Sequence, residues 1–129
     1  MQILITGGLG FVGSNLVDKL IEQGHDVTVV DNLSSESSSE EHKNPKAKYY
    51  IEDIRDLNLI IPTHIPSFDV IYHLAGLARI QPSFTSPLEY IDVNINGTAR
   101  VCELALKHGA RLIYSSSSSI NNGEYKTPY

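Results

Sequence analysis

The sequence predicts an α/β fold, a Rossmann-type doubly wound parallel sheet of about five strands with helices on both faces. Three observations lead to this prediction. Short runs of β-branched residues alternate with longer segments that have helical periodicity. A glycine-rich turn joins the first predicted strand to the first predicted helix. The 129 residues are enough for one such domain with a sizeable core, so we treat residues 1–129 as a single unit.

The first predicted strand is Ile3 to Ile5, and the helix that follows it spans Phe11 to Gln23. Gly24 is suited to the position just past the end of this helix. A second strand runs from Val27 to Asp31, and the serine-rich, acidic segment Asn32 to Lys46 is predicted to be a solvated loop. The remaining strands are expected at residues 49–52, 69–74 and 111–115.

The longest predicted helix spans Pro87 to His108, with proline in its first turn and Gly109 at its end. It carries two apolar strips, so it needs a partner on two sides. One partner is the sheet, and the other is a further segment or a second subunit. The first strip consists of Ile91, Ile95, Ala99, Cys102 and Leu106, and the second of Tyr90, Val93, Val101 and Leu104.

Composition excludes several classes of protein. Hydrophobic residues make up 41% and charged residues 19%, which is ordinary for a soluble globular domain. The net charge of −5 argues against nucleic acid or an anionic membrane as the main partner. Cys102 is the only cysteine, and neither a signal peptide nor a membrane span is recognisable. We therefore expect a cytoplasmic location.

Gly7, Gly10 and Gly13 form a G-x-x-G-x-x-G turn between the first strand and the first helix. Gly7 permits the tight turn, Gly10 lets a pyrophosphate approach the backbone, and Gly13 lets the helix pack closely. The N–H groups at the helix N-terminus, around Phe11 and Val12, would then face the phosphates. The alternative is a tight turn without a ligand.

Asp31 ends the second strand, where a carboxylate accepts hydrogen bonds from the adenosine ribose hydroxyls. It would repel a 2′-phosphate, so NAD is preferred over NADP. The alternative for Asp31 alone is an aspartate that caps the loop. Together with the glycine turn, it favours a dinucleotide site.

Six ordered motifs resemble the extended short-chain dehydrogenase/reductase family, and within it the nucleotide-sugar epimerases of the UDP-glucose 4-epimerase type. The resemblance covers nearly the whole chain. The motifs are Thr6-Gly7-Gly8-Leu9-Gly10-Phe11-Val12-Gly13, Asp31-Asn32-Leu33-Ser34, Asp53-Ile54-Arg55-Asp56, His73-Leu74-Ala75-Gly76-Leu77-Ala78, Asn94-Ile95-Asn96-Gly97-Thr98 and Tyr114-Ser115-Ser116-Ser117.

This resemblance implies roles for individual residues in holding NAD. Asp53 and Ile54 would contact the adenine, and Asn94 would support the active-site loop. The loop after the fourth strand would run along the pyrophosphate and the nicotinamide ribose. The cofactor-binding residues implied by the motifs and the turn are Gly7, Gly10, Phe11, Val12, Gly13, Asp31, Asn32, Asp53, Ile54, Leu74, Ala75, Gly76, Asn94 and Ser115.

The resemblance also implies the reaction, a transient hydride transfer at C4 of a nucleotide sugar such as a UDP-hexose. Ser117 would hydrogen-bond the 4-hydroxyl, and Tyr129 is the candidate base. The lysine that lowers the pKa of the family's tyrosine would fall four positions after Tyr129. We therefore expect a chain that stops before the substrate domain, binds NAD and turns over little sugar on its own. The family also implies a homodimer through the 87–108 helix.

Two other functions stay open at this stage. One is a member of the family that binds the dinucleotide without catalysis, and the other is a nucleotide-sugar dehydratase or reductase. Related dehydratases carry Asp-Glu after the catalytic residue, whereas Ser118 and Ser119 stand here, which favours an epimerase. The histidines show no metal-ligand spacing, so no metal is expected, and His73 and Cys102 are interpreted as packing residues.

Overall fold

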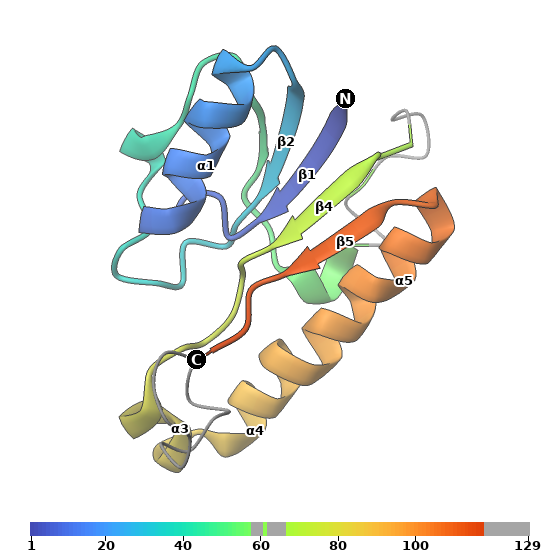
Figure 1. The fold of residues 1–129 in the computed structure, drawn as a ribbon. Coiled ribbons are helices and arrows are strands. Elements are labelled where there is room, and N and C mark those ends of the chain that lie inside the picture. Colours follow the sequence, from blue (N-terminus) through green and yellow to red (C-terminus); the bar gives the residue numbers. More distant parts are fainter. Residues whose placement is uncertain (58–60, 62–66, 118–129) are drawn as a thin grey trace, which may run out of the picture.

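The computed structural model describes residues 1–57, 61 and 67–117, and Figure 1 shows its fold. Five parallel strands form one sheet in the order β3-β2-β1-β4-β5. The predicted doubly wound α/β fold is therefore confirmed. The strands are β1 (Gln2–Thr6), β2 (Asp26–Val30), β3 (Lys48–Tyr50), β4 (Val70–His73) and β5 (Arg111–Tyr114).

The strand order reverses direction at β1. The chain runs from β1 outward through β2 to β3, then returns to pair β4 on the other side of β1. In register, Thr6 at the end of β1 lies opposite Val30 of β2 and His73 of β4. The loops that leave β1 and β4 therefore diverge from a common edge, and a crevice at such an edge is where open α/β sheets bind ligands.

Helix α1 (Phe11–Glu22) covers one face of the sheet. Val17 and Leu20 of α1 pack on Ile3 and Ile5 of β1 in one of the two buried clusters. Gly24 follows the helix with φ +80°, as the sequence predicts for the position past its end.

The opposite face is covered by α5 (Thr98–His108) and by the short helix η2 (Ile54–Asp56). Val101 and Leu104 of α5 pack with Leu4 and Ile71 of the sheet. α1 and α5 accordingly lie on opposite sides of the strands in Figure 1.

The predicted 87–108 helix has the right ends but is not one α-helix. It consists of α4 (Pro87–Ile91), a π-helical segment η3 (Asp92–Gly97) and α5, and the unpredicted helix α3 (Ile80–Thr85) precedes it. A π-helical turn carries an extra residue, which rotates the side chains before it relative to those after it.

Helix α4, segment η3 and helix α5 together form a rod, and only one of its two apolar strips is buried. Val93, Val101 and Leu104 face the sheet, whereas Ile95 is 61% and Leu106 83% exposed. Cys102, which the sequence indicates to be a packing residue, is half-buried.

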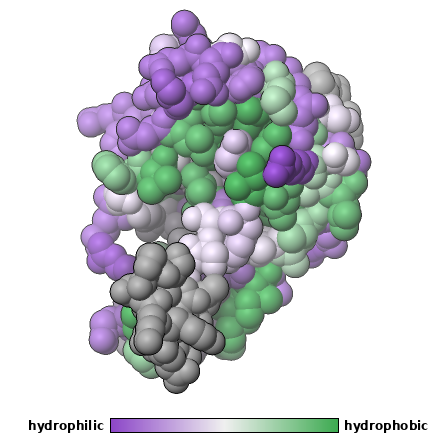
Figure 2. All heavy atoms as spheres, viewed as in Figure 1, coloured by the Kyte–Doolittle hydropathy of each residue, from purple (hydrophilic) through white to green (hydrophobic). Residues whose placement is uncertain are grey.

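Hydrophilic and apolar side chains occupy different parts of the surface. Figure 2 shows hydrophilic residues over the top of the molecule, where α1 lies, and apolar atoms below them, where the sheet emerges between α1 and α5. Ile113 and Tyr114 of β5 are among the large apolar side chains that stay exposed. Within residues 1–57, 61 and 67–117, no helix has both the length and the apolar character needed to cross a membrane.

Candidate functional site

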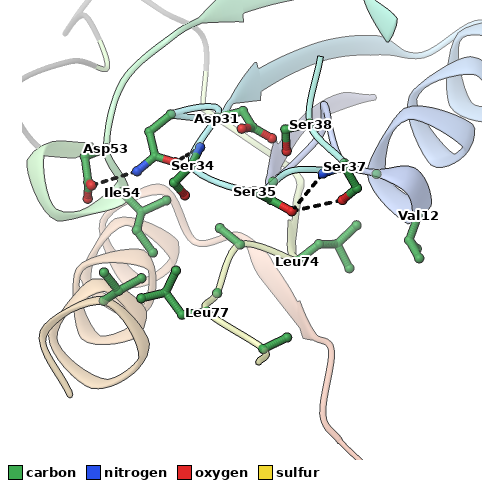
Figure 3. A pocket seen from close by; sticks show the side chains of 18 of the residues that line it. Val12, Asp31, Ser34, Ser35, Ser37, Ser38, Asp53, Ile54, Leu74 and Leu77 are labelled. Atoms are coloured by element: carbon green, nitrogen blue, oxygen red, sulfur yellow. Dashed lines mark hydrogen bonds between the residues drawn. The ribbon is translucent and has the colours of Figure 1, made fainter. Parts of the chain in front are cut away.

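A cavity of about 300 Å³ opens at the edge of the sheet where the loops after β1, β2 and β4 meet. Figure 3 shows Asp31 and a group of serines along one side, and Leu74 and Leu77 along the other. The predicted cofactor residues that line it are Gly7, Gly10, Phe11, Val12, Gly13, Asp31, Asn32, Asp53, Ile54, Leu74, Ala75 and Gly76.

The glycine turn is packed so closely that side chains cannot enter it. A Cβ on Gly7, whose φ is +74°, would lie 2.7 Å from the amide nitrogen of Ala75. A Cβ on Gly13 would lie 2.2 Å from the carbonyl oxygen of Gly7. The turn therefore requires glycine at both positions, and it presents bare backbone to the cavity.

Helix α1 directs its N-terminus at this cavity. Its N-cap residue is Gly10, which supplies no side-chain hydrogen bond to the first turn. The first N–H groups of a helix lack intrahelical partners, and they lie at the positive end of the helix dipole. Phe11 and Val12, whose amides belong to this turn, line the cavity, so a diphosphate fits this end of the helix.

The Asp31 side chain is buried, 6% exposed, and is held by two backbone donors. Its Oδ2 accepts a hydrogen bond from the Leu9 N–H at 2.9 Å, and its Oδ1 accepts one from the Leu33 N–H at 2.8 Å. Leu33 has a positive φ of 57°, in the left-handed region that a leucine rarely adopts. Each carboxylate oxygen keeps one further lone pair, which suits a diol such as a ribose.

At the far end of the cavity, Asp53 lies in a network of polar side chains (Figure 3). Its Oδ1 accepts from the backbone N–H and the Nε–H of Arg55, and its Oδ2 accepts from Arg55 Nη2 and Asn32 Nδ2. The hydrogen bonds from Arg55 hold the pKa of Asp53 below its ordinary value. Arg55 Nη1 also donates to Asp92 at 2.6 Å, which ties η2 to η3.

The carboxylate of Asp53 therefore already accepts four hydrogen bonds, which is its full capacity. A base at this end would contact the Ile54 side chain and the backbone more readily than the Asp53 oxygens. The contact between Asp53 and adenine that the resemblance implies stays a prediction.

Asn94 does not line the cavity but fixes one of its walls. Its Oδ1 accepts the Leu77 N–H at 2.8 Å, and its Nδ2 donates to the Leu77 carbonyl at 3.0 Å. Both backbone polar groups of one loop residue, Leu77, are thus satisfied by a side chain from η3. That Asn94 supports an active-site loop, as the resemblance implies, stays a prediction.

The segment after β2 lines the cavity, although its composition predicts a solvated loop. Ser34, Ser35, Ser37 and Ser38 line the cavity. The next residues, with η1 (Glu40–His42), reach the glycine turn, where the Ser39 N–H and the His42 Nδ1 both bond the Leu9 carbonyl. A carbonyl only accepts, so His42 carries a proton on Nδ1.

The other predicted site residues lie elsewhere. The backbone N–H of Ser115 continues the pairing of β5 by donating to the His73 carbonyl at 3.2 Å, and its side chain does not line the cavity. Ser117 is exposed at the end of the described chain. Tyr129 lies outside the described residues. Within the described ranges, no group of three or more His, Cys, Asp or Glu side chains is placed to hold a metal ion.

The chain is similar to a set of known proteins. The NAD dependent epimerase/dehydratase family matches residues 3–126. A UDP-glucose 4-epimerase of Yersinia enterocolitica is 40% identical, over 93% of this chain and 38% of its own length. A UDP-N-acetyl-alpha-D-glucosaminuronate decarboxylase of Bacillus cytotoxicus is 33% identical, over 92% of this chain and 37% of its own length.

The fold is also similar to that of a solved epimerase structure. The UDP-glucose 4-epimerase of Bifidobacterium longum, in complex with NAD+ and UDP, superposes with a TM-score of 0.82 at 28% identity, over 100% of this chain and 41% of that one. The chain thus spans about two fifths of the length of these relatives. Since the family matches nearly the whole sequence and the fold agrees, this chain belongs to the NAD dependent epimerase/dehydratase family.

Proposed function

We propose that this chain is the NAD-binding portion of a nucleotide-sugar 4-epimerase that acts on UDP-hexoses. The observation that carries the proposal is the glycine turn, whose bare amides lie beside the buried Asp31 carboxylate in one cavity. A diphosphate matches the amides, and a ribose diol matches the carboxylate. The similarity to 4-epimerases over most of the chain supports the choice of reaction.

In this proposal each wall of the cavity has its own task. The turn from Gly7 to Gly13 binds the diphosphate through N–H groups, and Asp31 binds the adenosine ribose. Leu77, held by Asn94, lines the opposite wall and excludes water from the reactive end. When bound, NAD supplies a reversible hydride acceptor for C4 of the sugar. Ser117 is proposed to hold the 4-hydroxyl by a hydrogen bond.

Binding of NAD to the purified chain is the first test. Titration calorimetry with NAD and NADP should show a preference for NAD, because the Asp31 carboxylate repels a 2′-phosphate. Asp31→Ala should weaken NAD about tenfold or more and NADP less, since hydrogen bonds to charged groups contribute about 1.5–3 kcal/mol.

Glu52→Gln is the matched control for that experiment. Glu52 also lines the cavity and is acidic, but the proposal gives it no contact with the ribose. It should leave the ratio of NAD to NADP affinity unchanged. Equal weakening of both nucleotides by Asp31→Ala would refute the ribose assignment, provided that urea unfolding shows the variant to be folded.

The reaction itself is tested in a chimera. The C-terminal part of the Yersinia enterocolitica epimerase, fused after residue 129, supplies the region that this chain does not span. We expect interconversion of UDP-glucose and UDP-galactose, and a loss of about 10²-fold in kcat for Ser117→Ala, as for removal of other preorganised hydrogen bonds. Elimination of water or release of CO₂ from suitable nucleotide sugars, without epimerisation, would assign the chain to another branch of the family.

A further inference from the structure

His73, the last residue of β4, is buried beneath the cofactor cavity without lining it. Its side chain is 1% exposed, and both ring nitrogens have partners. Nδ1 lies 2.7 Å from Oγ1 of Thr6 in β1, and Nε2 lies 2.9 Å from Oγ1 of Thr98 in α5. The ring also packs against Tyr114 of β5, with ring centroids 5.5 Å apart. One imidazole thus connects three strands and a helix.

Thr6 links His73 to the cavity wall. Its Oγ1 accepts a hydrogen bond from the Ala75 N–H at 3.3 Å, and Ala75 lines the cavity. Thr6 is fully buried and directly precedes Gly7. The same Ala75 amide nitrogen is the atom that a Cβ on Gly7 would meet at 2.7 Å. The Thr6 hydroxyl therefore links the glycine turn to the loop after β4, at the contact between Gly7 and Ala75. We call this contact the seam.

The hydrogen bonds of the two threonines favour one position for the proton of the His73 ring. Burial lowers the pKa of His73 to about 4, so the ring is neutral at pH 7 and has one donor and one acceptor. Thr6 Oγ1 accepts from Ala75, and its own proton needs an acceptor; Nδ1 is within reach. Nδ1 is then unprotonated, and the proton on Nε2 is donated to Thr98.

We propose that His73 is a positioning residue of the cofactor site. By accepting the Thr6 hydroxyl proton at Nδ1, it fixes the rotation of that hydroxyl and so directs a lone pair of the oxygen at the Ala75 amide. The inference rests on the proposed function, since the seam matters only if a dinucleotide binds across it. A buried histidine that merely joins elements would make its two threonine bonds equivalent. If His73 positions Thr6, the two bonds differ in their effect on NAD binding, because Thr6 and not Thr98 accepts the hydrogen bond from Ala75.

Thr6→Val and Thr98→Val form a matched pair for the test. Each replaces a threonine with a side chain of the same shape, and each removes one partner of the same ring. We expect Thr6→Val and His73→Phe to weaken NAD binding about three- to tenfold. Thr98→Val should lower the free energy of unfolding but change NAD affinity by less than about twofold. Thr6→Ser, which keeps the hydroxyl, should bind NAD like the unaltered chain.

Two spectroscopic readouts separate positioning from stability alone. Long-range ¹H–¹⁵N spectra of His73 should show an unprotonated Nδ1 and a protonated Nε2. Hydrogen exchange of the Ala75 amide should become faster in Thr6→Val than in Thr98→Val. The opposite tautomer, or equal losses of affinity in the two valine variants, would overturn the proposal.

Failure of the proposed function gives a different result. If the unaltered chain binds no NAD, the proposed function is wrong. The role of His73 in orienting Thr6 is then tested by the hydrogen-exchange rate of the Ala75 amide alone. Faster Ala75 exchange in His73→Phe, which keeps the Thr6 oxygen, than in Thr98→Val would support the orienting role of His73, and equal exchange would refute it.

Discussion

Gly13 makes the tightest backbone contact of the cofactor turn. Its missing Cβ would lie 2.2 Å from the Gly7 carbonyl oxygen and 2.7 Å from the Gly8 Cα, and neither atom can move without moving the turn. Gly13→Ala should therefore lower the free energy of unfolding by about 3 kcal/mol, the upper range for overpacking. Urea unfolding followed by circular dichroism measures this loss, and NAD affinity should fall with it.

Gly10→Ala is the matched control, since a Cβ there would meet nothing nearer than 3.5 Å. Gly10 also has a φ of −74°, which alanine adopts without strain. The free energy of unfolding should change by less than about 0.5 kcal/mol. A larger loss at Gly10 than at Gly13 would contradict this account of the turn.

His73 gives the protein a pH dependence on the acid side. Its pKa falls from 6.5 to about 4 on folding because burial disfavours the charged ring. Between these pH values the unfolded chain binds more protons, so stability decreases as the pH drops from 6.5 toward 4 and is unaffected by this group above 6.5. The full loss is roughly 3 kcal/mol.

Urea unfolding at pH 7 and at pH 4.5 tests this dependence. His73→Gln should reduce the difference between the two pH values. Burial also lowers the pKa of His108, whose Nδ1 accepts the Phe68 N–H, so it contributes with the same sign. The double variant with His108→Gln should be the least sensitive, and an unchanged pH dependence would exclude histidine as the source.

Residue types and local spacing were enough to predict much of the cavity. The glycines, Asp31 and the residues after β4 lie close to a strand end, and the end of a parallel strand fixes where its next residues go. The four cavity serines, Ser34, Ser35, Ser37 and Ser38, were missed because their place depends on the Leu9 carbonyl, which binds Ser39 and His42 from a distant part of the chain. Likewise, no local pattern shows that Asn94 pairs with Leu77.

The π-helical segment η3 sets the direction of the Asn94 side chain. The side chain forms two hydrogen bonds with the backbone N–H and carbonyl of Leu77 in the opposite loop, and both bonds are partly buried. Asn94→Ala should cost about 1–3 kcal/mol of unfolding free energy, because it leaves both groups unpaired. It should also weaken NAD binding, since Leu77 lines the cavity.

Asn96→Ala serves as the control within the same segment. Its Nδ2 donates to Asp92 Oδ1 at 2.9 Å in an exposed hydrogen bond, so its loss should change stability by less than about 0.5 kcal/mol. Equal effects of the two substitutions would show that helix disruption, and not the Leu77 contact, is being measured.

The π-helical segment could not be predicted from the sequence. Two apolar strips suggested a straight helix with two covered sides, and an extra residue in one turn changes the strips too little to be visible in the pattern. The strand positions were predicted to within a few residues, because buried parallel strands appear as continuous apolar runs. Which strip faces the sheet depended on packing that the periodicity of a two-sided helix does not specify.

The exposed apolar strip on the rod formed by α4, η3 and α5 predicts association of the chain with a second copy. Ile95 and Leu106 are 61% and 83% exposed, and the resemblance implies a homodimer through this rod. Ile95→Glu should shift a sedimentation-velocity concentration series toward the monomer, since a buried unpaired charge is costly. Lys107→Gln on α5 makes the same change in charge and should leave the series unaltered. A chain that is monomeric before substitution would contradict the prediction.

The central position of β1 has a consequence for the thermodynamics of binding. Because β2 and β4 flank β1 on its two sides, local unfolding reaches this strand late, whereas β3 and β5, which end the described sheet, fray early. The turn at Gly7 grows directly out of β1, so a ligand there meets backbone that is already ordered and loses little conformational entropy on binding. Occupancy of the turn should then raise the melting temperature of the whole sheet rather than protect one loop.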